Sequence, residues 1–233
     1  MKQKFVAFIP VRGGSKSIRF KNIKPLAGKP LVFWTIESAL QASIIQSVYV
    51  ATDSDIISKC VSEHFNSKKL FVIGRDPKTA TDLASSESVL LEFCKNYVFD
   101  YVFFIQATSP LLSSDDLNNA WNYYKDTNFD SLLSVVRQKR FLWQTRNNGQ
   151  AYPLNYDPRK RPRRQEFDGF LIENGAFYLS SRDNILLSNC RISGKIGVYE
   201  MNENSYYEID EKEDWLVVEQ IIKNFIGVKN EVK

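Results

Sequence analysis

The chain has 233 residues, of which 43% are hydrophobic and 25% charged, and this composition is typical of a globular protein rather than a disordered, collagenous or coiled-coil one. Its formal net charge of +4 is too small to indicate a nucleic-acid-binding protein by itself. Cys60, Cys94 and Cys190 are widely spaced and form no CxxC motif or Cys/His group, which disfavours a disulfide framework or a zinc site. The apolar stretch before Arg12 is shorter than the roughly 20 residues that a membrane helix needs. We therefore expect a cytoplasmic protein without a membrane segment.

Apolar runs alternate with amphipathic stretches, and this alternation favours βαβ units around a mostly parallel mixed sheet flanked by helices. The run at 100–106 is continuously apolar, as expected for a central strand that is buried on both faces. In chain order, we predict strands at 5–11, 47–52, 69–73, 100–106, 131–136, 175–179 and 195–201, and helices that begin near Pro30, Ser54, Ser85 and Ser113, with a final helix that carries Trp215, Val218, Ile222 and Phe225 on one face. We predict one α/β domain over 1–233.

The stretch 137–168 interrupts this pattern. It is basic, aromatic and proline-bearing, and it is too long for a simple connection in a compact domain. Loops of this length are generally functional or form part of an interface. We expect an excursion from the domain, with Trp143 a candidate for a subunit contact.

The loop after the first predicted strand carries two adjacent glycines, Gly13 and Gly14, and three cations, Arg12, Lys16 and Lys21. It matches neither the GxxxxGK[ST] nor the GxGxxG phosphate-binding pattern. Adjacent glycines still let backbone N–H groups approach an anion, and the carboxyl end of a strand is where open α/β sheets bind ligands. A triphosphate site is the functional interpretation, and a glycine turn with solvated charges is the alternative.

At this point the sequence resembles the acylneuraminate cytidylyltransferase family, the CMP-sialic acid synthetases. The family's amino-terminal fingerprint corresponds to 12–22 here, and the other matching motifs are ATDSD at 51–55, LASSES at 83–88, IQATSPL at 105–111, KRPRRQ at 160–165 and ENGAFY at 173–178. The last two motifs are similar to the animal-type branch. The resemblance implies a GT-A-like nucleotidyltransferase fold and transfer of CMP from CTP to a nine-carbon 2-keto sugar acid, with release of pyrophosphate.

The resemblance also implies roles for individual residues. Arg12, Lys16, Lys21 and Asn22 would hold the triphosphate and cytidine, and cations that tighten on the transition state suit attack on an anionic phosphate. The positions that match the family around cytosine and ribose are Arg75, Thr81 and Ser86, for which helix capping is the alternative. Those that match its sugar side are Gln106, which otherwise satisfies a turn, and Arg163, Arg164 and Asn174.

The basic cluster at 159–164 has two other interpretations, a solvated loop or a nucleic-acid contact. No stacking platform or recognised nucleic-acid motif accompanies it, so we expect no nucleic-acid partner. For the family's Asp-x-Asp metal motif, this chain has Glu208 and Asp210, which alternate on an extended segment and so point the same way. The resemblance thus implies Mg²⁺ on Asp210 and Glu208, and a homodimer, or a tetramer, that uses 137–168 as its interface. A CMP-Kdo synthetase and a non-catalytic nucleotide- or nucleic-acid-binding protein remain the alternatives.

Overall fold

The computed structural model describes residues 3–15 and 17–231, and within them a seven-stranded sheet with helices on both faces. The strand order is β11-β7-β10-β6-β1-β4-β5. Strands β1, β4, β5 and β6 pair in parallel, β10 is antiparallel to both β6 and β7, and β11 is parallel to β7. The sheet strands are β1 (Phe5–Pro10), β4 (Ser47–Thr52), β5 (Leu70–Gly74), β6 (Tyr101–Ile105), β7 (Ser131–Gln138), β10 (Phe170–Ser181) and β11 (Ile196–Met201).

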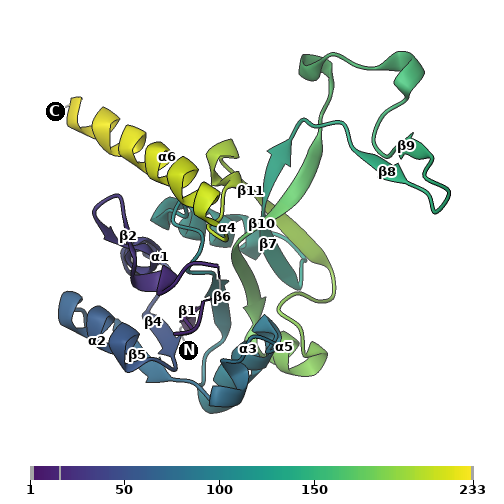
Figure 1. The fold of residues 1–233 in the computed structure, drawn as a ribbon. Helices are drawn as coiled ribbons and strands as arrows, with labels where there is room; N and C mark the ends of the chain where they lie inside the picture. Colours follow the sequence, from purple (N-terminus) through teal and green to yellow (C-terminus); the bar gives the residue numbers. More distant parts are fainter. Residues whose placement is uncertain (1–2, 16, 232–233) are drawn as a thin grey trace.

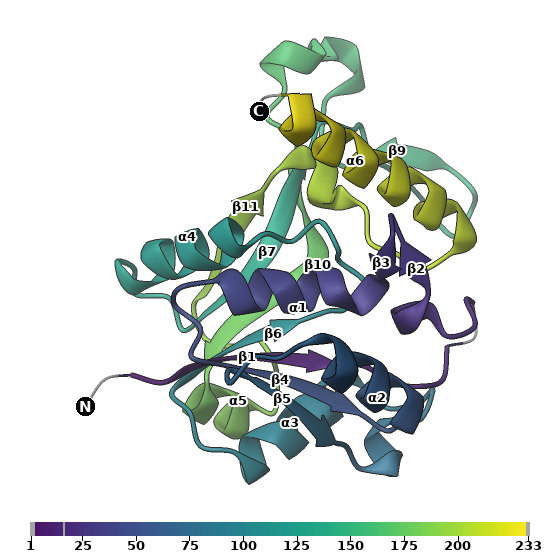
Figure 2. The same cartoon turned by 90° about the vertical axis from the view of Figure 1, so that its left-hand side faces the viewer.

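Six α-helices surround the sheet or lie at its edge (Figures 1 and 2). Most begin at a side-chain cap: the Ser54, Ser85, Ser113 and Ser181 hydroxyls each accept a hydrogen bond from a first-turn N–H. The helix that starts at Arg182 was not expected from the sequence, because it has only two turns. The helices are α1 (Leu31–Gln41), α2 (Asp55–His64), α3 (Ser86–Asn96), α4 (Ser114–Lys125), α5 (Arg182–Ser188) and α6 (Lys212–Glu231).

Alternation along the strands divides the core between the two faces of the sheet. On β1, Ala7 and Ile9 pack with the residues of α1, α2 and α4, whereas Val6 and Phe8 pack with α3 and α5. A third apolar cluster joins α6 to the start of the chain through Ile18, Leu26, Leu31, Ile209, Trp215, Val218 and Ile222. The predicted apolar face of the last helix is therefore buried, except that the Phe225 side chain lies outside the described part of the structure.

The predicted excursion is present and runs from 139 to 169, between β7 and β10. Its bounds differ slightly from the predicted 137–168, since β7 continues to Gln138 and β10 begins at Phe170. It contains a small hairpin of β8 (Trp143–Thr145) and β9 (Ala151–Pro153) and two short 3₁₀ turns, η3 (Pro158–Lys160) and η4 (Arg164–Glu166). Figure 1 shows it standing away from the sheet and its helices. Phe141, Tyr156 and Phe167 pack against one another inside it, so the excursion has a small aromatic core of its own.

Candidate active site

A cavity of about 620 Å³ opens where β1 and β6 end. Its walls come from the loop after β1, the loop between β5 and α3, the turn after β6 and the segment 208–211. Parallel strands place their carboxyl ends at one edge of a sheet, so these loops, which are distant in sequence, converge there. Nine of the side chains selected from the sequence line it: Arg12, Lys21, Asn22, Arg75, Thr81, Ser86, Gln106, Glu208 and Asp210.

Arg12 lines this cavity and forms an ion pair, at 2.6 Å, with Asp82, which lines it from the loop between β5 and α3. The loop that follows Arg12 is fixed by Asp53, whose carboxylate accepts a hydrogen bond from the N–H of Gly13 at 2.8 Å. A Cβ on Gly13 would approach the Cβ of Ser54 to 2.8 Å, so this position requires glycine. The loop is therefore held in place before any ligand binds.

Lys21 and Asn22 enter the cavity from a single 3₁₀ turn, η1 (Lys21–Ile23). The Lys21 ammonium donates to the backbone carbonyl of Ile209 at 2.8 Å and lies 3.1 Å from the carboxylate of Asp210. Asn22 donates its amide to the backbone carbonyl of Arg12 at 3.2 Å. This turn thus connects the Arg12 loop to the acidic segment. Lys16, the remaining cation selected from the sequence, lies outside the described residues.

Glu208 and Asp210 both line the cavity, while Ile209 between them is fully buried in the apolar cluster under α6. The alternation expected from the sequence is therefore present. Burial and then the charge of Asp210 raise the pKa of Glu208 to about 7, against the opposing effect of Lys21. Over the described ranges there is no group of three or more His, Cys, Asp or Glu side chains arranged to hold an ion. Mg²⁺ usually takes one or two carboxylates together with substrate phosphates, and this donor pair fits it.

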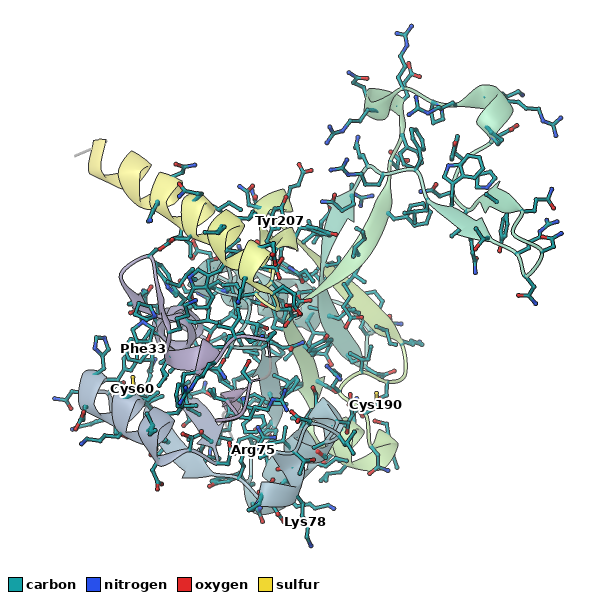
Figure 3. All side chains as sticks on the ribbon, viewed as in Figure 1. Phe33, Cys60, Arg75, Lys78, Cys190 and Tyr207 are labelled. Atoms are coloured by element: carbon teal, nitrogen blue, oxygen red, sulfur yellow. The ribbon has the colours of Figure 1, made fainter. Side chains whose placement is uncertain are left out.

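The wall between β5 and α3 carries Arg75, Thr81 and Ser86. Arg75 donates to the backbone carbonyl of Thr79, and burial lowers its pKa while Asp53 and Glu92 oppose that effect. Figure 3 shows Arg75 between the sheet and α3, with Lys78 of the same loop pointing away from the protein. The cap of α3 is Ser85 rather than Ser86, so capping does not account for the Ser86 hydroxyl.

Gln106 follows β6 and faces the bulge in β10. The register of β10 shifts between Glu173 and Tyr178, and Gly175 within this bulge has a φ of +66°. A Cβ on Gly175 would lie 3.0 Å from Nε2 of Gln106 and 3.1 Å from Oε2 of Glu208. The absence of a side chain at this glycine therefore leaves room for both groups beside the cavity.

Three residues assigned to sugar binding lie outside the cavity lining of this chain. Asn174 is only 3% exposed and donates to the backbone carbonyl of Ser205 at 2.9 Å, so here it anchors the bulge of β10. Arg163 and Arg164 are exposed on the excursion, and Arg164 lies 3.8 Å from Glu203. Their roles in substrate binding stay predictions that require a second copy of the chain or a rearrangement.

Asp53 and Asp82 lie shortly before predicted helices and were not among the site residues selected from the sequence. In the structure Asp82 lines the cavity and pairs with Arg12, whereas Asp53 is not part of the lining and fixes the adjacent loop by accepting a hydrogen bond from the N–H of Gly13. The sequence did contain a clue to both residues, since Asp53 lies within the ATDSD motif and Asp82 directly precedes the LASSES motif. The sequence could not show that the loops of Asp53 and Asp82 lie beside the loop of Arg12, because these loops are remote from one another along the chain.

Three comparisons with known proteins agree with this arrangement. Residues 6–230 match the family model described as cytidylyltransferase. The chain is 40% identical to the N-acylneuraminate cytidylyltransferase of Oncorhynchus mykiss, over 96% of this chain and 51% of that protein. It is 29% identical to the pseudaminic acid cytidylyltransferase of Campylobacter jejuni, over 91% of this chain and 93% of that protein. The chain thus spans about half the length of the first of these relatives.

Solved structures show the same fold at low sequence identity. CMP:2-keto-3-deoxy-manno-octonic acid synthetase complexed with CTP aligns with a TM-score of 0.70 at 19% identity, over 95% of this chain and 99% of that one. The 4-diphosphocytidyl-2C-methyl-D-erythritol synthase of Anaerococcus prevotii gives a TM-score of 0.71 at 11% identity, over 95% and 96%. The expected α/β fold of nucleotidyltransferase type is confirmed. None of the helices in 3–15 and 17–231 is both long enough and apolar enough to cross a bilayer.

Proposed function

The chain belongs to the cytidylyltransferase family, and from this premise we propose that it transfers CMP from CTP to the anomeric hydroxyl of a nine-carbon 2-keto sugar acid. The observation that carries the proposal is one cavity lined both by the cations Arg12 and Lys21 and by the carboxylates of Glu208 and Asp210. Relatives named as N-acylneuraminate and pseudaminic acid cytidylyltransferases support a sugar acid as the acceptor.

The reaction is a displacement at the α-phosphorus of CTP. The anomeric oxygen of the sugar acid bonds to this phosphorus, the bond to the oxygen that bridges the α- and β-phosphates breaks, and pyrophosphate leaves with the bonding electrons while the hydroxyl proton is released. Negative charge on the phosphate oxygens grows in the transition state, so fixed cations lower the barrier. Lys21 is held by Ile209 and Asp210 and is therefore oriented in advance for this role.

The nucleotide and the sugar acid would occupy different walls of the cavity. Arg75, Thr81 and Ser86 line the part between β5 and the start of α3 and are assigned to cytidine, while Gln106 lies beside Gly175 of β10 and is assigned to the sugar. An amide side chain both donates and accepts hydrogen bonds, which suits a polyhydroxylated substrate.

We propose Mg²⁺ as the cofactor, held by Asp210 and Glu208. When bound, the ion would neutralise phosphate charge. An Asp210→Asn variant should require a higher Mg²⁺ concentration for half-maximal rate, because it loses one anionic ligand. Glu213→Gln, an exposed position of α6, is the matched control and should not change this concentration. An unchanged Mg²⁺ requirement in Asp210→Asn would contradict the assignment.

We also propose a homodimer, or a tetramer, in a cytoplasmic setting, with the excursion at the interface. The excursion stands away from the body and exposes Trp143 and Leu154, each 52% exposed. A partner subunit that packed there would bury both side chains and bring Arg163 and Arg164 toward a cavity.

Pyrophosphate release from CTP and Mg²⁺ tests the proposed reaction. The acceptors are N-acetylneuraminic acid, its deaminated form, legionaminic acid, pseudaminic acid and the eight-carbon acid Kdo, with UTP in place of CTP as the nucleotide control. We expect turnover with CTP and at least one nine-carbon acid. Preference for Kdo would indicate a CMP-Kdo synthetase instead. CTP binding without turnover on any acid would indicate a non-catalytic nucleotide-binding protein.

A further inference from the structure

Arg191 lies behind the wall of the cavity, in the loop between α5 and β11, and it does not line the cavity itself. Its side chain is only 21% exposed although the residue belongs to a surface loop. It contacts groups on three other elements, namely α3, β6 and β10. A guanidinium with so many partners has a fixed position, and its contacts show which parts of the site it holds together.

The first partner of Arg191 is Glu87, in the first turn of α3. Nε of Arg191 donates to Oε1 of Glu87 at 2.5 Å, and the Glu87 side chain is only 25% exposed. Burial would raise the pKa of Glu87, but the hydrogen bond and charge of Arg191 outweigh it and lower that pKa. Bonds of this kind are roughly twice as strong as neutral ones. Ser86, which directly precedes Glu87, and Val89, two residues after it, line the cavity, so this bond fixes the nucleotide wall.

The second contact of Arg191 is with aromatic rings of the sheet. Its guanidinium carbon lies 4.8 Å from the ring centre of Tyr178 on β10 and 5.7 Å from that of Phe104 on β6. Phe104 lines the cavity, and Tyr178 donates its hydroxyl hydrogen bond to Glu173 across the bulge of β10. Arg191 therefore rests on the same strands that carry the sugar side of the cavity.

We propose that Arg191 is a positioning residue for the nucleotide: through Glu87 it holds the first turn of α3 at a fixed distance from β6 and β10, and so keeps Ser86 in place for cytidine. This inference rests on the proposed function, because it assumes that the α3 wall binds the nucleotide. The helix is fixed at its other end by a different arginine. Arg182 donates to the backbone carbonyls of Cys94 and Tyr97, which lie at the end of α3.

These two arginines provide a matched comparison, since both anchor α3 and only one anchors the end that lines the cavity. Removing either guanidinium should lower the melting temperature. Only the removal of Arg191 should weaken the binding of CTP, because Arg182 lies at the far end of the helix. A purely structural role for Arg191 predicts that both variants behave alike.

The test measures steady-state kinetics and melting temperature for Arg191→Met, Glu87→Gln, the double variant and Arg182→Met, all beside the wild-type enzyme. For Arg191→Met we expect KM for CTP to rise about tenfold, as for the loss of one charge-assisted hydrogen bond, with kcat and KM for the sugar acid changed less than about twofold. The double variant should match the single Arg191 variant, because the two side chains act as a unit. Arg182→Met should lower the melting temperature without changing KM for CTP.

Failure of this inference is distinguishable from failure of the proposed function. Wild-type protein that shows no turnover of CTP with any sugar acid refutes the function. Wild-type turnover combined with an unchanged KM for CTP in Arg191→Met and Glu87→Gln refutes only the positioning role. An equal rise of KM in Arg182→Met also refutes it, because the effect would then follow from loosening the helix as a whole. Glu87→Gln keeps the shape of the side chain and so provides a result even if Arg191→Met folds poorly.

Discussion

Arg12 and Asp82 lie 70 residues apart in the chain and meet at the cavity, with 2.6 Å between Nη1 and Oδ1. Both side chains line the space assigned to the substrates. The carboxylate of Asp82 thus occupies a position on Arg12 that the proposed function gives to a phosphate. If the chain binds CTP as proposed, the phosphate competes with this carboxylate for Arg12.

Asp82→Asn should therefore lower KM for CTP. Ion pairs at this degree of exposure contribute only a modest free energy, so we expect a change of about threefold. Steady-state kinetics at fixed Mg²⁺ and sugar acid measures it. Asp126→Asn, at the end of α4, is the control and should leave KM unchanged. A rise of KM in Asp82→Asn would show that Asp82 helps to bind the nucleotide instead.

Lys21→Ala should lower kcat by about hundredfold, the typical effect of removing one group that stabilises developing charge. The Lys21 side chain is 12% exposed and its ammonium bonds to Ile209 and Asp210. We therefore also expect a modest decrease in melting temperature, while the protein still folds. The control is Lys24→Ala, whose ammonium lies over the ring of Trp215 and outside the cavity lining. If Lys21→Ala loses its melting transition while kcat persists, Lys21 has a structural role.

Gly175→Ala should reduce kcat/KM for the sugar acid by about tenfold, because the added methyl group displaces Gln106 and Glu208 by a few tenths of an ångström. Backbone strain at positive φ also costs stability, and Gly28→Ala controls for it. Gly28 has a φ of +93°, and apart from its chain neighbours no atom of the residues that the structure describes would lie within 4 Å of a Cβ there. Equal kinetic losses in the two variants would mean that strain alone is responsible.

Acid should remove the stabilisation that Glu87 provides. The pKa of Glu87 is lowered in the folded protein, so its ion pair with Arg191 stabilises the fold fully above the ordinary value of 4.5 and less as pH falls through the folded-state pKa. We expect wild type to melt above Glu87→Gln at neutral pH and the difference in melting temperature to shrink as the pH falls below 4.5. Thermal unfolding between about pH 3 and pH 7 measures this. If the difference in melting temperature between wild type and Glu87→Gln does not change with pH, it arises from side-chain packing and not from the ion pair.

Trp143→Asp should convert the proposed dimer into a monomer, because it places a charge on an exposed aromatic side chain of the excursion. Light scattering at micromolar concentration gives the mass. Val98→Asp alters an apolar side chain on the body that is 78% exposed, and it should leave the mass unchanged. A wild-type monomer under these conditions would contradict the dimer itself.

The sequence predicted the sheet strands well because their apolar runs are continuous and end at recognisable loops. It placed the end of β7 too early and the start of β10 too late, because the polar residues Arg137 and Gln138 and the sequence Glu173-Asn174-Gly175 interrupt the apolar pattern. These residues extend because the two strands pair with each other, from Phe170 opposite Gln138 onward. Such pairing is a tertiary contact that no local pattern reports.

For the site, the sequence by itself determined which chemical groups are available: cations after the first strand, two alternating carboxylates near the end, and motifs that identify the family. Residue type, spacing and hydrophobic period carry that information along the chain. Only the tertiary structure decided that Arg12 faces Asp82, that Asn174 is buried against Ser205, and that Arg163 and Arg164 lie on a projecting segment. Those outcomes depend on distances between loops, and these distances arise only when the strands assemble into one sheet.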